Sequence, residues 1–288
     1  MPTYSYFTVD VFTNRRFGGN PLAVFPDAQG LDAPTMQALA AEINYSETTF
    51  VLPPDDPSNT ARVRIFNRTA EMPFAGHPNV GTAWIMSSLG LASGPRLRFE
   101  VPAGIVEVSL CPDGKVEIEA PQPLSTGPSL PAALVAPCLS VDPARIVTSR
   151  HQPLVASVGI DFLLVEVEEG SLIDLAPDIT AFRQAASAED CTRLSILAYE
   201  RCVDMVRARM FAPLAGTWED PATGSANAAL AALLLSLGGE GKLEFQVVQG
   251  VEMGRPSMLF LRAWRTGDEI RSAVAGRCVP VFSGTVSL

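Results

Sequence analysis

The chain has 288 residues, 47% of them hydrophobic and 18% charged, which predicts a compact globular protein with room for two domains. Its 21 lysine and arginine residues against 31 aspartate and glutamate residues give a formal net charge of −10, which argues against a nucleic-acid or anionic-membrane partner. No apolar run approaches the roughly 20 residues that span a bilayer, and the first residues lack a signal-peptide pattern, so we expect a cytoplasmic protein.

Cysteine and histidine, the usual ligands of zinc, are few and scattered. The five cysteines are an odd number with no CxxC pair, so neither a disulfide framework nor a zinc site is expected. The two histidines, His77 and His151, lie far apart in the sequence. We therefore predict that the protein holds no metal.

The first part of the sequence predicts mostly strands. A strand at residues 4–12 is followed by a glycine-containing turn and a second strand at 21–25. Asp32 is expected to cap a helix that runs to about Ile43, with Pro34 in its first turn. Further strands are expected up to Leu52 and at residues 63–66, 97–101, 105–110 and 116–120.

A proline-rich stretch at residues 121–137 predicts the crossover between two domains. Beyond it, strands are expected at residues 162–167, 194–198, 206–211, 243–248, 258–264 and 270–275. The last segment, residues 278–288, could return to the first domain because chain ends often lie close together. The expected domains are residues 1–123 with 277–288, and residues 124–276.

An internal repeat supports this division into two similar domains. Residues 219–238 (EDPATGSANAALAALLLSLG) align without a gap on residues 71–90 (EMPFAGHPNVGTAWIMSSLG), and eight of the twenty positions are identical. The tripeptides Arg-Met-Phe at 209–211 and Arg-Ile-Phe at 64–66 precede the two copies. The pattern indicates a duplicated unit in which a strand leads into a helix.

Each copy has a glycine turn followed by an apolar run that ends in Ser-Leu-Gly, a common helix stop. The run at residues 228–237 is apolar on all sides, so it predicts a helix that is buried around its whole circumference. Among strands, such a helix is best covered by a curved sheet wrapped around it. The expected fold class is therefore α+β, with two pseudosymmetric domains, each a barrel-like β-sheet around a central apolar helix.

The glycines at the two helix starts, Gly76 and Gly224, are candidates for binding an anion. The first N–H groups of a helix lack internal partners and carry partial positive charge, which favours a bound carboxylate. The alternative is that both glycines serve only in tight turns. Their repetition, with Ser225 as a further donor beside Gly224, favours a substrate carboxylate held between the two domains.

Glu47 is the first candidate for chemistry. No lysine or arginine lies within ten residues of it on either side, and its neighbours are Ser46, Thr48, Thr49 and Phe50. Burial without a cation favours a raised pKa, which suits general acid/base catalysis near neutral pH. The alternative is a glutamate exposed to water at the edge of a helix or strand.

His77 and Asp220 flank the two glycine turns, and the repeat predicts that they face one cleft. A histidine can exchange protons at physiological pH, and an aspartate can orient it or bind a substrate amine. Both residues could instead be ordinary turn residues, since each lies close to a proline. Asn20, which follows Gly18 and Gly19, is a candidate polar wall of the substrate site.

Six spaced motifs lie between about Asp10 and Ser257: VDVFTNRRFGGNPLAV, NYSETTFV, EMPFAGHP, RMFAP, EDPATGSAN and QGVEMGRPS. Together they resemble the motifs of the PhzF-like isomerase family of phenazine biosynthesis. The resemblance implies the diaminopimelate-epimerase-like fold, with the site in the cleft between two domains. It also implies cofactor-independent movement of a proton within a dihydro-hydroxyanthranilate-type ring.

By these motifs, Glu47 would be the proton shuttle and His77 and Asp220 its assistants. Gly76, Gly224 and Ser225 would bind the substrate carboxylate. The related racemases and epimerases use two cysteines, each directly before the glycine of a helix start. Here those positions hold Ala75 and Thr223, which cannot act as thiolates, so stereoinversion by two thiols is disfavoured.

Three functions are compatible with this sequence. The first is an isomerase acting on a small cyclic carboxylate. The second is a lyase, in which the same proton abstraction beside a hydroxyl expels water. The third is a binding protein that retains only the carboxylate site, although a carboxylate site gains nothing from the added negative charge of Glu47. A homodimer is expected on general grounds, with no segment that marks its interface.

Overall fold

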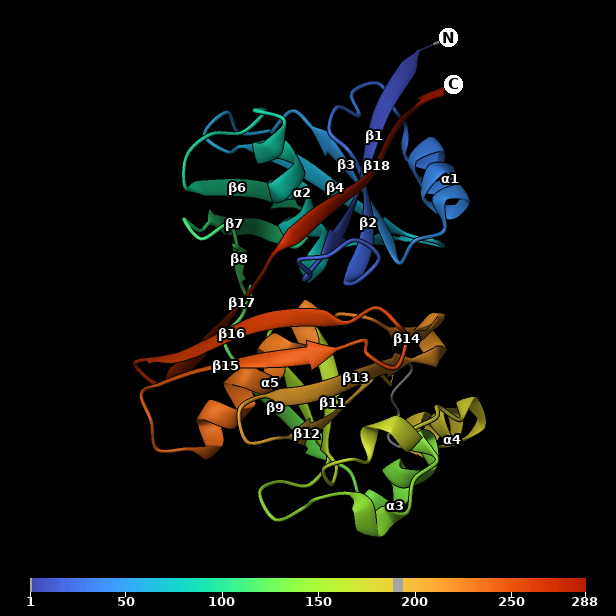
Figure 1. The fold of residues 1–288 in the computed structure, drawn as a ribbon, viewed down its shortest axis with the longest axis vertical. Helices are drawn as coiled ribbons and strands as arrows, with labels where there is room; N and C mark the ends of the chain where they lie inside the picture. Colours follow the sequence, from blue (N-terminus) through green and yellow to red (C-terminus); the bar gives the residue numbers. More distant parts are fainter. Residues whose placement is uncertain (1, 189–193) are drawn as a thin grey trace. The chain divides into compact units, whose positions relative to one another are not determined.

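The computed structural model describes residues 2–188 and 194–288. The chain forms two compact units, which we describe separately (Figure 1). Unit 1 comprises Met1–Glu119 and Ala275–Leu288, and unit 2 comprises Ala120–Val274. That each unit is an independent domain, with boundaries after residues 123 and 276, stays a prediction.

Unit 1 is mainly β-structure with two helices. Its strands are β1 (Thr3–Val11), β2 (Asn20–Phe25), β3 (Glu47–Leu52), β4 (Ala61–Asn67), β5 (Glu71–Met72), β6 (Arg96–Val101), β7 (Gly104–Leu110), β8 (Val116–Glu119) and β18 (Cys278–Ser287), and its helices are α1 (Ala33–Ile43) and α2 (Gly76–Ser88). The final strand, β18, pairs antiparallel with β1.

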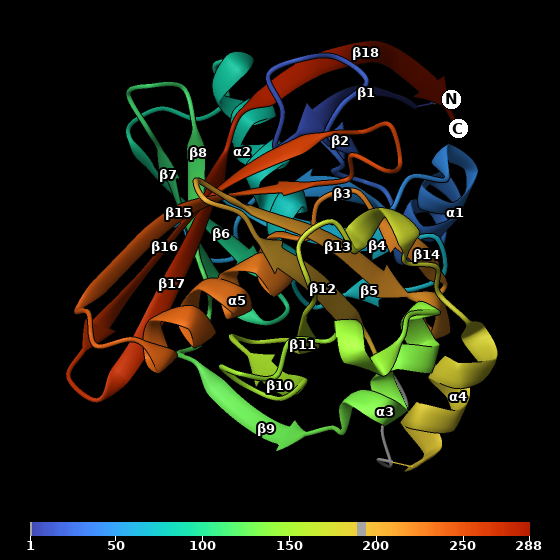
Figure 2. The same cartoon turned by 60° about the horizontal axis from the view of Figure 1, so that its bottom comes forward.

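Unit 2 is likewise mainly β-structure with a few helices. Its strands are β9 (Ser125–Ser129), β10 (Leu154–Ser157), β11 (Asp161–Glu166), β12 (Ile196–Arg201), β13 (Val206–Ala212), β14 (Thr217–Asp220), β15 (Lys242–Gln249), β16 (Ser257–Thr266) and most of β17 (Glu269–Gly276), and its helices are α3 (Ala132–Val135), α4 (Ile179–Ala188) and α5 (Gly224–Leu237). Figure 2 shows α3 and α4 near each other at one end of this unit, where both contribute to a shared apolar cluster.

The strand pairings of the two units follow one pattern. In unit 1, β1–β2 is antiparallel, β2–β3 parallel, β3–β4 and β4–β5 antiparallel, β4–β6 parallel and β6–β7 antiparallel. In unit 2, the same sequence of directions joins β10–β11, β11–β12, β12–β13, β13–β14, β13–β15 and β15–β16. The repeat found in the sequence is therefore a repeat of topology.

A buried helix lies at the centre of each pattern. Helix α2 contacts β1, β2, β3, β7 and β8, and α5 contacts β10, β11, β15 and β16. Both helices are buried along most of their length, as expected for α5, whose run is apolar on every side, and α2 also buries polar residues such as Asn79 and Thr82. In α2, Gly81 allows close packing, since a Cβ there would lie 2.6 Å from Leu22 Cδ2.

The repeat extends to individual hydrogen bonds. Arg64 forms a two-pronged ion pair with Glu71, with Nε–Oε1 and Nη2–Oε2 distances of 2.8 and 2.7 Å. Arg209 uses the same atoms to bind Glu219, at 2.8 Å in both cases. Each arginine also lies over a phenylalanine two residues further on. These forks fix the strand that leads into each helix start.

Candidate functional site

Glu47 lies at the first position of β3, where the chain enters the sheet from α1. Helix α1 begins as expected, with Asp32 accepting a hydrogen bond from the Thr35 N–H at 2.9 Å. It ends at Asn44, whose positive φ of 60° turns the chain toward β3. There Glu47 pairs with Leu22 of β2, and its side chain is 17% exposed. The carboxylate is thus held on a rigid strand and remains accessible.

His77 is the partner that unit 1 places beside Glu47. It is the second residue of α2, and its Nε2 lies 3.3 Å from Glu47 Oε2. Burial lowers the pKa of His77 from 6.5 to about 3, because the ring is almost completely removed from water. The imidazole is therefore neutral at physiological pH.

Asn20 determines which nitrogen of His77 carries the proton. The Ser46 hydroxyl donates to Asn20 Oδ1 at 3.0 Å, so the amide nitrogen of Asn20 faces His77 Nδ1 at 3.3 Å. An amide nitrogen can only donate, so Nδ1 accepts and the proton of the neutral ring lies on Nε2. The protonated nitrogen Nε2 is thus the one that lies 3.3 Å from Glu47 Oε2.

The turn before β2 explains how Asn20 reaches this position. Gly19 has a φ of 64°, and a Cβ there would lie 2.3 Å from the Val11 carbonyl oxygen. Only glycine permits so close an approach of the turn to β1. The Phe17 N–H donates to Asp10 Oδ2 at 2.7 Å and fixes the other side of the turn.

Of the residues predicted from the sequence, unit 1 contains Asn20, Glu47, Gly76 and His77. Asn20 hydrogen-bonds His77, His77 Nε2 lies 3.3 Å from Glu47 Oε2, and Gly76 is the first residue of the helix that carries His77. Ser46, which hydrogen-bonds Asn20, was missed by the sequence analysis. Its position directly before Glu47 was the available signal.

Unit 2 contains the remaining candidates, at the start of α5. Asp220 ends β14 and is 8% exposed, and Gly224 and Ser225 are the first two residues of the helix. The Thr223 hydroxyl donates to Asp220 Oδ2 at 2.5 Å. That Asp220 and His77 face a common cleft stays a prediction.

Both helix starts lack a capping side chain. The residue before α2 is Ala75, which has no polar group, and the residue before α5 is Thr223, whose hydroxyl does not bind the helix. Ordinarily a threonine at this position accepts a hydrogen bond from the first turn. In both helices, the N-cap side chain therefore leaves the first N–H groups without the hydrogen bond that it usually supplies.

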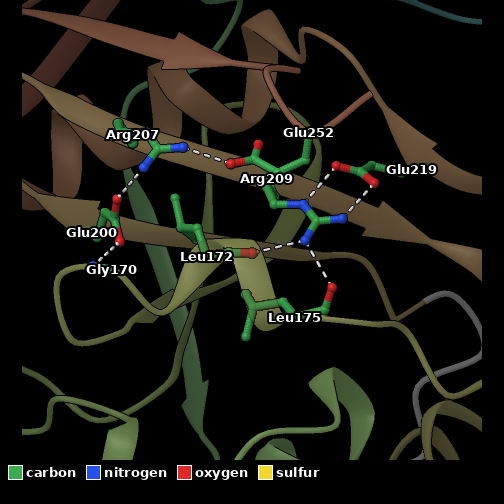
Figure 3. Close-up of polar contacts among 8 residues, drawn as sticks. All are labelled: Gly170, Leu172, Leu175, Glu200, Arg207, Arg209, Glu219 and Glu252. Atoms are coloured by element: carbon green, nitrogen blue, oxygen red, sulfur yellow. Dashed lines mark hydrogen bonds and ion pairs between the residues drawn. The ribbon is translucent and has the colours of Figure 1, made fainter. Parts of the chain in front are cut away.

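Glu219, the neighbour of Asp220 in β14, belongs to a set of ion-paired residues in unit 2 (Figure 3). Glu219 is neutralised by Arg209, which also donates to the carbonyl oxygens of Leu172 and Leu175 at 2.8 and 2.7 Å. Arg207 of β13 forms ion pairs with Glu200 of β12 and with Glu252 in the turn after β15. The adjacent acids Glu219 and Asp220 therefore have different partners, and Arg209 binds Glu219.

In the described part of the chain, no three His, Cys, Asp or Glu residues lie close enough together to hold a metal ion. Cys111, Cys138, Cys202 and Cys278 are free thiols, and Cys191 lies outside the described residues. No helix in residues 2–188 or 194–288 is both long and apolar enough to cross a membrane.

Comparison with known proteins identifies the family. The model of the phenazine biosynthesis-like (PhzC-PhzF) proteins matches residues 9–284. The chain belongs to this family. An uncharacterised isomerase of Mesorhizobium japonicum is 38% identical over 99% of both chains. The trans-2,3-dihydro-3-hydroxyanthranilate isomerase of Pseudomonas chlororaphis is 35% identical over 99% of this chain and 100% of its own.

A solved structure confirms the fold. The PhzF-family protein of Bacillus anthracis superposes with a TM-score of 0.89 at 23% identity, covering 100% of both chains. The expected α+β architecture is confirmed, as is the resemblance to PhzF-like proteins. The chain is thus a PhzF-like isomerase, and its substrate and the roles of individual residues are addressed below.

Proposed function

We propose that the chain is a cofactor-independent isomerase in which Glu47 moves a proton between two carbons of a small cyclic carboxylate. The observation that carries this proposal is a row of side chains that ends at Glu47: Ser46 hydrogen-bonds Asn20, Asn20 hydrogen-bonds His77, and His77 Nε2 lies 3.3 Å from Glu47 Oε2. A base held on a strand, with one oxygen beside a neutral imidazole, suits repeated proton transfer.

In the proposed reaction, a Glu47 oxygen takes the proton from a C–H bond and the electron pair moves into the substrate's conjugated system. The same carboxyl group then returns the proton to a different carbon, so the mass of the substrate does not change. His77 is neutral and its protonated Nε2 lies beside Glu47, so it would stabilise the carboxylate without competing for the substrate proton. Its assigned role is to orient Glu47.

We assign the substrate carboxylate to the starts of α2 and α5. These helix N-termini have no cap from Ala75 or Thr223, and partial positive charge at a helix start favours an anion. Gly76, Gly224 and Ser225 would supply the N–H and hydroxyl donors. Asp220 would bind an amino or hydroxyl group of the same substrate.

The relative from Pseudomonas chlororaphis supports this substrate class, since its name specifies a dihydro-hydroxyanthranilate. The sequence also argues against the two-thiol chemistry of related racemases, because Ala75 and Thr223 replace both thiols. We further propose a homodimer, which light scattering coupled to size-exclusion chromatography would test.

The experiment that tests the function follows small cyclic amino- and hydroxy-carboxylates, including trans-2,3-dihydro-3-hydroxyanthranilate, in deuterated water. Wild type, Glu47→Gln and the matched control Glu71→Gln are compared by NMR and mass spectrometry. Glu71 lies in the same unit but is held by Arg64, so glutamine at this position removes the same charge at a carboxylate that is not assigned to the reaction and keeps one acceptor oxygen for Arg64.

We expect wild type and Glu71→Gln to convert at least one substrate and Glu47→Gln to be inactive, because glutamine cannot carry the proton. The product should have the mass of the substrate apart from deuterium. Loss of water would instead indicate the lyase. Full activity of Glu47→Gln would refute the proposed role of Glu47.

A further inference from the structure

Gln249 is a buried residue that the proposed mechanism does not use, and it lies beside the turn that carries Asp220. It ends β15 and is 1% exposed. Its Nε2 contacts the Asp220 carbonyl oxygen at 2.8 Å and Thr223 Oγ1 at 3.3 Å. Its Oε1 contacts Asn227 Nδ2 at 2.7 Å and the Thr223 N–H at 3.3 Å.

The backbone determines the orientation of this amide. A carbonyl oxygen can only accept, so the Gln249 nitrogen must face the Asp220 carbonyl. A backbone N–H can only donate, so the Gln249 oxygen must face Thr223 N. Asn227 agrees with this assignment, since its Nδ2 also donates to the Thr223 carbonyl at 2.9 Å.

The same logic determines the direction of the Thr223 hydroxyl. Its oxygen accepts a hydrogen bond from Gln249 Nε2, so its own proton is directed to Asp220 Oδ2, 2.5 Å away. A threonine that served only as a helix cap would instead face the first turn of α5, and no such bond is formed. The Thr223 hydroxyl therefore donates its hydrogen bond to the Asp220 carboxylate.

Two further contacts hold the turn against β15. Gly250 has a φ of 75°, and a Cβ there would lie 2.6 Å from the carbonyl oxygens of both Pro221 and Arg255. The Ser257 hydroxyl donates to the Pro221 carbonyl at 2.9 Å, with the Arg255 carbonyl also 3.0 Å away. The turn that carries Asp220 is thus fixed by the segment from Gln249 to Ser257.

We propose that Gln249 and Thr223 are positioning residues that present the Asp220 carboxylate in one orientation, as an acceptor for an amino or hydroxyl group of the substrate. This inference rests on the proposed function, because it takes Asp220 as a substrate-binding group. The hydrogen bond from the Thr223 hydroxyl favours the ionised form of this carboxyl group, which is the form that accepts from a substrate donor. The substrate class is accordingly one with a hydrogen-bond donor near its carboxylate.

The test compares Thr223→Val, which keeps the shape but loses the hydroxyl, with Thr223→Ser, which keeps the hydroxyl. Gln249→Glu keeps the acceptor oxygen but loses the donor. The matched control is Thr82→Val, because Thr82 is a buried threonine of unit 1 whose hydroxyl contacts Thr49 at 2.8 Å. Circular dichroism confirms that each variant is folded.

We expect Thr223→Val and Gln249→Glu to lower kcat/KM by roughly 10- to 100-fold, the usual effect of a lost hydrogen bond to a charged group. The acid limb of their pH profile should move to higher pH, because a carboxylate without its donor is protonated more readily. Thr223→Ser should restore both properties, and Thr82→Val should leave the limb in place. In an Asp220→Asn background, Thr223→Val should add little further loss.

A second readout does not depend on turnover. NMR titration of the Asp220 side-chain carboxyl should show protonation at higher pH in Thr223→Val than in wild type. An unchanged midpoint, or failure of Thr223→Ser to restore it, would overturn the positioning role. A shifted midpoint together with a fully active Glu47→Gln would retain the positioning role and refute the proposed function.

Discussion

The neutral, buried state of His77 predicts that the protein loses stability on mild acidification. A histidine whose pKa is lowered by folding resists protonation in the native state and takes up a proton readily when unfolded. Its contribution to stability is complete above pH 6.5 and is lost as the pH falls toward 3. Replacement of His77 by glutamine, which has no such protonation, should remove this part of the acid sensitivity.

The magnitude follows from the pKa values in the unfolded and folded states, 6.5 and about 3. Each pH unit between them costs about 1.4 kcal/mol, so acidification to pH 5 should cost up to about 2 kcal/mol through His77 alone. The nearby Glu47 carboxylate favours the protonated form of His77 and so raises its pKa in the folded state, which makes the value of about 2 kcal/mol an upper limit.

Urea unfolding of wild type and His77→Gln at pH 7.5 and pH 5.0 measures the difference. Wild type should lose more stability than the variant between the two values, by as much as about 2 kcal/mol. A His151→Gln variant separates the contribution of the other histidine. Because the chain has only two histidines, NMR of the two imidazoles should also show His77 protonated on Nε2 alone. Equal acid losses in wild type and His77→Gln, or a proton on Nδ1, would refute the reasoning.

Two further predictions compare equivalent positions of the repeat by urea unfolding. Arg209→Lys should lower the free energy of unfolding by about 3 kcal/mol, since lysine cannot satisfy Glu219 and two carbonyl oxygens together. Arg64→Lys, in the more exposed fork, should lower it by less than about 1 kcal/mol. Equal losses of stability in the two variants would contradict this role of burial. Gly81→Ala should destabilise the protein by about 1–3 kcal/mol because its Cβ would overlap Leu22 and Val11, although alanine favours helices. Ala229→Gly, at the matching position of α5, should destabilise it by about 1 kcal/mol. A Gly81→Ala variant more stable than wild type would show that the strands carrying Leu22 and Val11 can move away.

Local patterns predicted much of this fold correctly. Asp32 and Pro34 correctly marked the start of α1, and the apolar runs after Gly76 and Gly224 correctly marked the two buried helices. The repeat indicated duplicated architecture, because equivalent residues were still visible in both copies. These features depend on neighbours in the sequence, which a single chain displays.

Other elements depend on partners far along the chain and were not predicted. The proline-rich stretch contains β9, whose side chains are all exposed and whose pairing with β10 has no sequence pattern. Helix α4 was missed although it carries a mixed apolar and polar face.

For the site, the sequence nominated Glu47, His77 and Asn20, but not the hydrogen bonds that orient them. The candidate list also omitted Gln249 and its contact with Thr223, because that contact spans 26 positions.

The pairing of β1 with β18 determines the order in which the protein can form on the ribosome. Unit 2 is inserted between β8 and β18, so β18 is synthesised after all of unit 2. Until then, the edge of β1 that β18 will cover exposes unpaired N–H and C=O groups along its length. Unit 2 can thus fold completely before unit 1. Until β18 is synthesised, unit 1 keeps an unpaired strand edge that chaperones and proteases can recognise.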